Sequence, residues 1–298
     1  MSLRPVKRVI QAKPTLEGAG VKLRRGFGFS DTSEFDPFLL FDDFRNERPE
    51  DYIAGFPWHP HRGIETITYV LAGTVAHADS LGNQGAMGPG DVQWMTAGSG
   101  ILHQEMPTGD EAGRMHGFQL WANLPASLKM TKPRYQDVTS GEIPEITDDD
   151  GTRVRVVCGS FWGRRGPVDG IAADPSYLDI WVPPLKRKTL PVETHRHAFG
   201  YVFEGSGMFR DASLPGGVLT EKADDSIVRE SIGNRSIVVF DAGDEVTVTA
   251  GPQGIRFLLV SGKPIAEPVA WYGPIVMNTK DELRRAVSEL QAGTFIKS

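Results

Sequence analysis

Short alternating runs of apolar and polar residues, separated by turn-forming residues, constrain the fold of this 298-residue chain most strongly. Examples of such runs are residues 65–71 (ETITYVL), 236–240 (SIVVF) and 255–260 (IRFLLV). The 34 glycines and 21 prolines are spread along the chain and punctuate these runs. Strands of this length, separated by Gly, Pro, Asn and Asp turns, predict an all-β protein built as a sandwich or barrel.

The length of the chain predicts two hydrophobic cores rather than one. A single helix is expected, over residues 280–291, where apolar residues recur at helical spacing. Asn278 and Thr279 supply a cap at its start, and Gly293 a stop after its end. We expect this helix to pack on the outside of a barrel.

A weak internal repeat predicts that the two cores are similar. Residues 69–73 (YVLAG) align with 201–205 (YVFEG), and Gly90-Asp91 aligns with Gly243-Asp244. In these alignments four polar residues of the first half fall on unrelated residues of the second half. The pairs are His59 with Pro191, His61 with Glu193, His103 with Arg256, and Glu105 with Leu258. The second half therefore keeps the turns of the first but lacks its histidines.

The composition excludes several classes of protein. A net charge of −6 with interspersed charges offers no basic surface, so direct nucleic-acid binding is not expected. One cysteine, Cys158, excludes an internal disulfide framework and fits a reducing compartment. No segment has the length of a signal peptide core or a membrane span. We therefore expect a cytoplasmic protein, or also a nuclear one in a eukaryote.

Two pairs of polar residues with a spacing of two predict a metal site. His59 and His61 precede one β run, and His103 and Glu105 lie about forty residues later. Alternate side chains of a strand share a face, so each pair presents two ligand atoms side by side. Three imidazoles and one carboxylate suit a mononuclear transition-metal ion with open coordination positions. The donor set alone does not select among iron, nickel, copper, cobalt and manganese.

The segments GFPWHPHRGIETITYVLAG and GPGDVQWMTAGSGILHQEMP resemble the pirin family of the cupin superfamily. The likeness continues through HGFQLWANLP, KMTKPRYQ and GKPIAEPVAWYGPIVMNT, and so covers nearly the whole chain. The resemblance implies a bicupin, with two antiparallel jelly-roll barrels and a short C-terminal helix. We expect a metal-binding domain over 1–139, a linker over 140–151, and a second cupin domain over 152–298 that lacks the ligands and ends in the helix. It also implies one Fe²⁺ ion held by His59, His61, His103 and Glu105.

Residues around the predicted ligands are candidates for binding a substrate or supporting the site. Aromatic and apolar side chains could wall a pocket; the candidates are Phe56, Trp58, Trp94 and Met95. Arg62, His116 and Gln119 are candidates for orienting the ligands or the substrate. His195 and His197 also have the two-residue spacing, but no downstream His or Glu matches them, so a second metal is not expected.

The resemblance implies a dioxygenase that opens the ring of a flavonol-like substrate with O₂, as a quercetin 2,3-dioxygenase does. Glu105, the carboxylate among the predicted ligands, is the expected catalytic base, which takes the proton of the enolic hydroxyl of the substrate. A second hypothesis is a regulatory protein that senses redox state through its iron and binds a transcription factor or a metabolic enzyme. A third is a storage or scaffold cupin without either activity, since cupins carry many functions.

Overall fold

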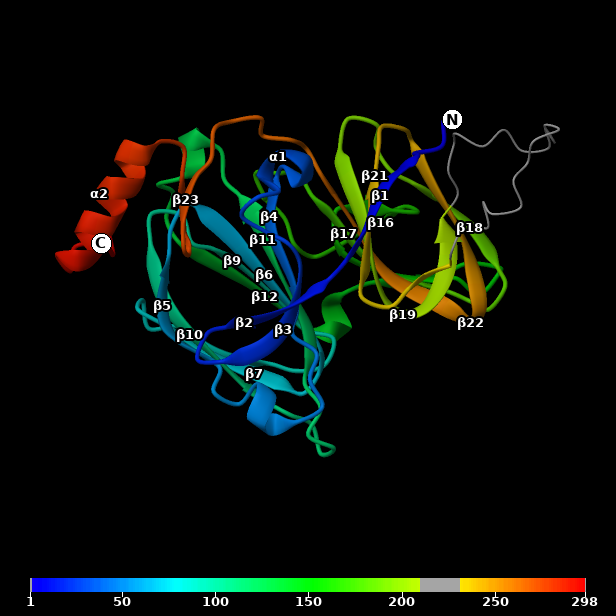
Figure 1. Ribbon diagram of the computed structural model, residues 1–298, viewed down its shortest axis with the longest axis horizontal. Helices are drawn as coiled ribbons and strands as arrows, with labels where there is room; N and C mark the ends of the chain where they lie inside the picture. Colours follow the sequence, from blue (N-terminus) through cyan, green and yellow to red (C-terminus); the bar gives the residue numbers. More distant parts are fainter. Residues whose placement is uncertain (1, 210–230, 298) are drawn as a thin grey trace. The chain divides into compact units, whose positions relative to one another are not determined.

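The computed structural model describes residues 2–209 and 231–297, and these residues form mainly antiparallel β-sheet (Figure 1). Strands account for 54% of the residues and helices for 9%, which confirms the expected all-β class. Among the described residues, none of the helices combines the length and apolar character needed to cross a lipid bilayer.

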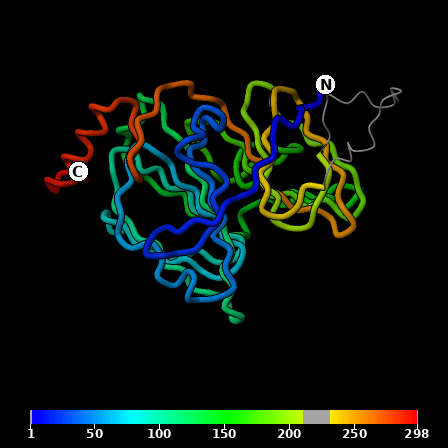
Figure 2. The backbone as a smooth tube through the Cα atoms, viewed as in Figure 1, coloured from blue at the N-terminus to red at the C-terminus, as the bar shows by residue number. Residues whose placement is uncertain are grey.

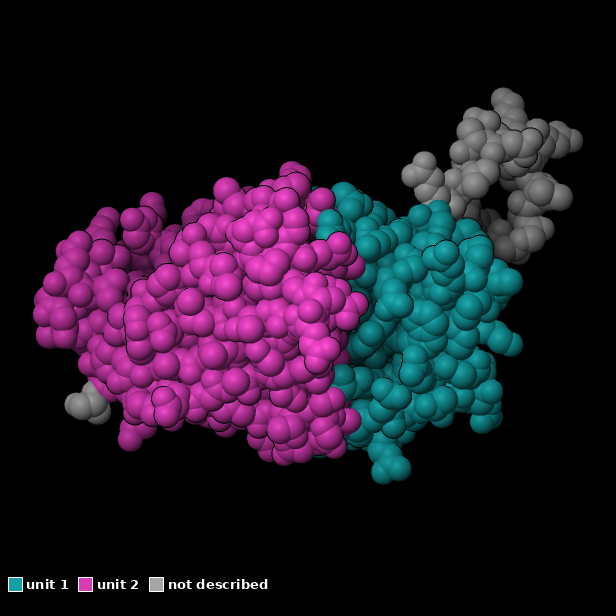
Figure 3. Space-filling view, turned by 90° about the horizontal axis from the view of Figure 1, so that it is seen from below, with its two compact units in different colours: residues 1–11, 144–166, 175–262 teal, residues 12–143, 167–174, 263–298 magenta. Residues whose placement is uncertain are grey.

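The chain forms two compact units, which Figure 3 colours separately. Unit 1 contains residues 1–11, 144–166 and 175–262, and unit 2 contains residues 12–143, 167–174 and 263–298. This division differs from the predicted linear one, because both ends of the chain belong to the unit formed by the other half. The first strand, blue in Figure 2, pairs with a strand of residues 236–240. The pattern of a strand in the sequence does not reveal its partner, so the linear division missed this exchange.

Unit 2 contains two sheets, with strand orders β5-β10-β7-β8 and β12-β9-β6-β11-β4-β3-β2, together with the hairpin β23–β24. Its strands are β2 (Lys13–Glu17), β3 (Val21–Phe27), β4 (Phe38–Asp43), β5 (Phe56–His61), β6 (Ile64–Ala72), β7 (Thr74–Asp79), β8 (Gln84–Met87), β9 (Val92–Thr96), β10 (Ile101–Thr108), β11 (His116–Asn123), β12 (Arg134–Val138), β23 (Ala270–Tyr272) and β24 (Ile275–Met277). Its helices are α1 (Thr32–Phe35), the 3₁₀ turns η1 (Pro49–Asp51), η2 (Ala126–Leu128) and η3 (Ser140–Glu142), and α2 (Lys280–Gln291).

The described residues of unit 1 form a nine-stranded sheet and the small hairpin β15–β16. Its strands are β1 (Val6–Gln11), β13 (Glu145–Thr147), β14 (Arg153–Cys158), β15 (Ser160–Phe161), β16 (Arg164–Arg165), β17 (Ser176–Val182), β18 (Arg187–Pro191), β19 (His197–Phe209), β20 (Ile232–Gly233), β21 (Ser236–Phe240) and β22 (Glu245–Gly262). The predicted linker 140–151 is thus partly structured, since η3 and β13 lie within it.

The C-terminal helix begins and ends where the sequence predicts. The hydroxyl of Thr279 accepts a hydrogen bond from the amide of Glu282, whose carboxylate bonds back to the Thr279 amide, so a capping box fixes the start of α2. Ala286 is fully buried, in a cluster with Ile275 and Phe295. The helix packs on β23 and β24, which places it in unit 2 rather than in the second cupin domain.

Hydrogen-bond register shows how the two barrels match. Tyr69 lies opposite Val92 and Phe118, and Tyr201 lies opposite Ile237 and Leu258. The aligned runs therefore occupy equivalent strands. Gly73 and Gly205, the turn residues after them, both have positive φ, at 77° and 65°. This part of the predicted repeat is confirmed.

The other half of the predicted repeat is wrong. Val92 and Ile237 are equivalent, so β9 matches β21, and Gly90-Asp91 cannot match Gly243-Asp244. The strand that carries His103 and Glu105, β10, matches the start of β22 instead. Gly73 and Gly205 are equivalent, and counting paired strand residues from them gives four equivalent pairs. These are His59 with Leu190, His61 with Val192, His103 with Val246, and Glu105 with Val248. All four unit 1 residues are buried aliphatics of its core.

Candidate metal centre

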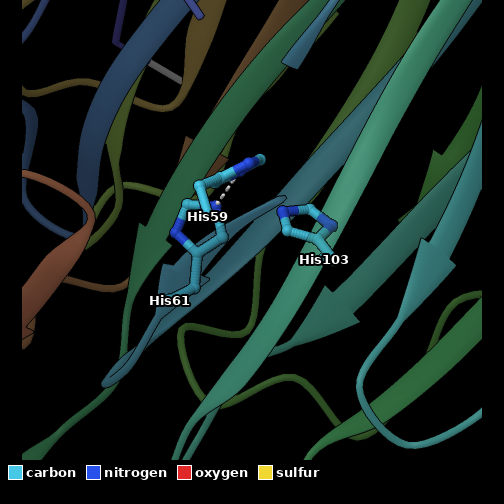
Figure 4. Close-up of side chains that lie close together, drawn as sticks. All are labelled: His59, His61 and His103. Atoms are coloured by element: carbon cyan, nitrogen blue, oxygen red, sulfur yellow. Dashed lines mark hydrogen bonds between the residues drawn. The ribbon is translucent and has the colours of Figure 1, made fainter. Parts of the chain in front are cut away.

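Two adjacent strands of unit 2 bring three histidines together (Figure 4). His59 and His61 lie on β5, and His103 lies on β10, directly opposite His59 in the antiparallel ladder. One ring nitrogen of each histidine lies within 4.8 Å of the others. His61 and His103 are 2% and 1% exposed, so the cluster is shielded from water on most sides.

Backbone carbonyls fix the tautomers of two of these rings. Nδ1 of His59 lies 2.9 Å from the oxygen of Pro57, and Nδ1 of His61 lies 3.3 Å from the oxygen of Pro274. A carbonyl oxygen can only accept, so Nδ1 carries the hydrogen in both neutral rings. Both Nε2 atoms then present lone pairs, and they face each other at 3.1 Å. Two facing lone pairs repel each other unless a cation lies between them.

Two of the histidines, His61 and His103, are held in the neutral form that binds metals. Burial, with the neighbouring His103 and His59, lowers the pKa of His61 well below its ordinary value. Burial and His59 lower the pKa of His103 to about 3. Neither ring nitrogen of His103 has a hydrogen-bond partner among the described residues, although the ring is buried. An unpartnered buried imidazole is costly, and a metal ion would provide the missing partner.

The spacing of the nitrogens fits a transition-metal ion. Imidazole nitrogens bind such ions at about 2.1 Å, so two in neighbouring octahedral positions lie about 3.0 Å apart. The 3.1 Å between the Nε2 atoms of His59 and His61 agrees with this value. The nitrogen donors and their spacing therefore fit a bound transition-metal ion, and His59, His61 and His103 are the residues that would hold it.

Glu105 lies near the three histidines but is not part of the group within 4.8 Å. It follows His103 by two residues on β10, and its Oε1 accepts a hydrogen bond of 3.2 Å from the hydroxyl of Thr68. That hydroxyl also lies 2.8 Å from the end of the Gln119 side chain. A hydroxyl donates one hydrogen, so when Thr68 donates to Glu105 the Gln119 amide turns its nitrogen toward Thr68 and donates to it. Burial raises the pKa of Glu105, while His59 and the Thr68 hydroxyl oppose the rise. A cation beside Glu105 would favour its ionised form.

His59 and His61 line a cavity of about 650 Å³ inside unit 2, which is large enough for a small organic ligand. Of the residues predicted to contact a substrate, Phe56 and Trp58 line this cavity, as does Gln119. Trp94 and Met95 do not. Both have no exposed surface, and Met95 packs in a core cluster with Ile64. Consecutive residues of β9 are buried on both faces, so an apolar pair there did not indicate a pocket.

Two predicted supporting residues have other partners. Arg62 turns away from the histidines, pairs with Glu289 at 2.8 Å, and donates to the backbone oxygen of Phe295 at 2.7 Å. It therefore anchors the C-terminal segment. His116 packs edge-on against Phe118, with Nε2 3.8 Å from a carboxylate oxygen of Asp43. Arg62 directly follows His61, and adjacent strand residues point to opposite faces, so nearness in sequence did not place it at the histidine cluster.

Within residues 2–209 and 231–297, His59, His61 and His103 form the one group of three or more metal-binding donors. His195 and His197 are not part of such a group. The ring of His195 lies 3.4 Å from a carboxylate oxygen of Glu193, and both side chains are more than half exposed.

Four residues of the site were not among those predicted from the sequence. Thr68 contacts Glu105, Pro274 orients His61, and Trp121 and Trp271 line the cavity. The sequence could have pointed to Trp121, because it lies on the same strand face as the candidate residue Gln119. Pro274 and Trp271 had no such signal, because they lie about 210 residues beyond His61 in the chain and reach the site through the hairpin β23–β24.

Two cupin barrels in one chain, one of them with an inward-facing histidine cluster, define a bicupin with a candidate metal centre. Family models described as pirin and pirin C-terminal cupin domain match residues 20–122 and 177–296. The chain belongs to the pirin family.

Similar proteins span several kingdoms. A pirin-like protein of Caulobacter vibrioides is 42% identical over 296 residues, which cover 99% of this chain and 100% of the relative. The pirin of Homo sapiens is 38% identical, with 97% and 93% of the two chains covered. A crystal structure of quercetin 2,3-dioxygenase from Acinetobacter baumannii superposes with a TM-score of 0.86 and 29% identity, and covers 98% of each chain.

Proposed function

We propose that this protein is an iron(II)-dependent dioxygenase of flavonol-like substrates, of the quercetin 2,3-dioxygenase type. The observation that carries the proposal is the pair of Nε2 lone pairs of His59 and His61, which converge beside the unpartnered ring of His103 at the wall of a large cavity. The likeness to the quercetin 2,3-dioxygenase of Acinetobacter baumannii supports the substrate class.

The bound metal would supply Lewis acidity and a site for substrate and O₂. Three histidines would hold it, with Glu105 as the proposed fourth ligand. In this proposal, Glu105 also accepts the proton of the enolic hydroxyl of the flavonol, which leaves the substrate as an electron-rich anion. The Thr68 hydroxyl donates to Oε1 of Glu105 and so fixes the direction of the carboxylate. Dioxygen adds to the activated ring, both of its oxygen atoms enter the opened product, and one ring carbon leaves as carbon monoxide.

Elemental analysis of purified protein, followed by aerobic and anaerobic assays of the iron-loaded protein with quercetin, tests this function. We expect about one iron per chain and loss of quercetin that requires O₂. Iron-loaded protein that consumes no flavonol in the presence of O₂ would refute the enzymatic proposal. Higher turnover with nickel, copper, cobalt or manganese would correct the identity of the metal.

A second candidate function, a metal-dependent regulator that binds a protein partner, is favoured by one observation. Trp58 adjoins His59 in sequence and is 52% exposed, so an aromatic surface residue lies next to a proposed ligand. Oxidation of the metal would add one unit of positive charge near this residue and so change the surface to which a protein partner binds. Partner capture that depends on the iron redox state and is lost in His103→Ala would support this function over catalysis.

A further inference from the structure

Three aromatic side chains extend from the histidine cluster along the cavity wall. The ring of Trp121 meets the ring of His61 edge-on, with centroids 5.1 Å apart. Trp271 lies 6.0 Å from Trp121, and Phe29 lies 5.2 Å from Trp271. All three line the same cavity as His59 and His61. We call Phe29, Trp121 and Trp271 the aromatic platform.

The turn of one hairpin orients both the platform and a proposed metal ligand. The indole N–H of Trp271 donates to the backbone oxygen of Gly273, in the turn between β23 and β24. The next residue, Pro274, accepts from Nδ1 of His61 through its own oxygen. Since the polar group of Trp271 is already satisfied within the turn, the indole offers the cavity a flat apolar surface at a fixed position relative to His61.

Part of the remaining lining is aliphatic, while Phe44, Tyr52, Phe56 and Trp58 add further aromatic surface. Val21, Leu23 and Val75 line the cavity with aliphatic surface, from the cluster that also contains Met115. Aliphatic walls accept apolar groups of many shapes. Aromatic faces favour flat rings, which stack against them in offset or edge-on geometry. Phe29 is 67% exposed, so the platform runs from solvent to His61.

We propose that the aromatic platform is a recognition site for planar, conjugated polycyclic ligands and makes this cavity select flat flavonoids over bent ones. The flavonoid class of the ligand rests on the proposed function, but the selection for planarity rests on the platform. Trp271 is its central residue, because it contacts both Trp121 and Phe29.

Binding to the metal-free protein tests the platform apart from catalysis. The probes are luteolin, a planar flavone, and eriodictyol, which has the same hydroxyl groups but a saturated bond that bends the molecule. Neither carries the enolic hydroxyl needed for the proposed reaction. Isothermal titration calorimetry would measure both dissociation constants for the wild type, Trp271→Leu, Trp271→Phe and Phe29→Leu. Tyr272→Leu is the matched control, because Tyr272 adjoins Trp271 but is 67% exposed and does not line the cavity.

We expect the wild type to bind luteolin roughly 10-fold more tightly than eriodictyol. Trp271→Leu should remove most of this preference, Phe29→Leu part of it, and Trp271→Phe or Tyr272→Leu little. No binding of luteolin to the wild type, equal affinity for both probes, or a preference unchanged in Trp271→Leu would overturn the proposal. If the protein shows this preference for luteolin but does not oxidise quercetin, the proposed recognition site stands and only the proposed function is refuted.

Discussion

The two barrels of this protein use equivalent strand positions for opposite purposes. In unit 2 four positions hold His59, His61, His103 and Glu105, and in unit 1 the equivalent positions hold Leu190, Val192, Val246 and Val248. The unit 1 residues are buried in a continuous core, whereas His103 is buried without a hydrogen-bond partner. The same framework therefore folds around aliphatic side chains. Unit 2 therefore retains its polar cluster at a cost in stability, which a structural role does not explain.

Replacing His103 of unit 2 by valine, the residue at the equivalent position 246 of unit 1, should have the largest effect on metal binding and activity. His103→Val should abolish stoichiometric metal binding and lower quercetin turnover by at least about 10³-fold, because one of the three proposed imidazole ligands is lost. The metal-free variant should unfold at no lower temperature than the metal-free wild type, since a buried unpartnered ring has been removed. Elemental analysis and calorimetry would measure these quantities. A variant that retains a full equivalent of metal would show that His103 is not a ligand.

The reverse substitution tests the other side of the comparison. Val246→His places an imidazole in the aliphatic core of unit 1, where Val246 is 1% exposed. Lost packing and buried nitrogens should lower the free energy of unfolding by about 3 kcal/mol. Scanning calorimetry would detect the change. Met208→His, on the same unit at a residue 48% exposed, is the control and should change stability by less than about 0.5 kcal/mol. Equal stability of the two variants would contradict the assignment of Val246 to the core.

Acid should reveal the cost of the buried histidines in the metal-free protein. The pKa of His103 is lowered to about 3 in the folded state. Below pH 6.5 the unfolded chain therefore binds a proton that the folded chain does not, and stability is lost as the pH falls. At pH 5 the loss from His103 should be about 2 kcal/mol. Urea unfolding at pH 7 and pH 5 would measure it, and His103→Gln should lack this part of the pH dependence. An identical dependence in both proteins would mean that His103 titrates normally.

The fold class, the C-terminal helix and the clustering of three histidines could be predicted from the sequence, because each depends on local periodicity or on spacing within a strand. The assignment of chain segments to the two units could not be predicted. Strand partners are set by contacts between distant residues, so the sequence did not indicate that β1 pairs with β21 or that Pro274 contacts His61. The predicted repeat failed at Gly243 for the same reason, since a Gly-Asp turn occurs before more than one strand.

The smallest expected effect concerns Thr68, whose equivalent in unit 1 is Gly200. Thr68→Val removes the hydroxyl that donates to Glu105 but keeps the shape of the side chain. That hydrogen bond lowers the pKa of Glu105, so its loss should raise this pKa and shift the acid limb of the pH–rate profile upward. We expect kcat to fall roughly 10-fold, equivalent to about 1.4 kcal/mol, with metal content unchanged. Thr66→Val is the control, because Thr66 is equally buried on the same face of β6 and lies opposite Trp121 instead. If both variants lower kcat equally without moving the pH profile, Thr68 acts through packing and does not position Glu105.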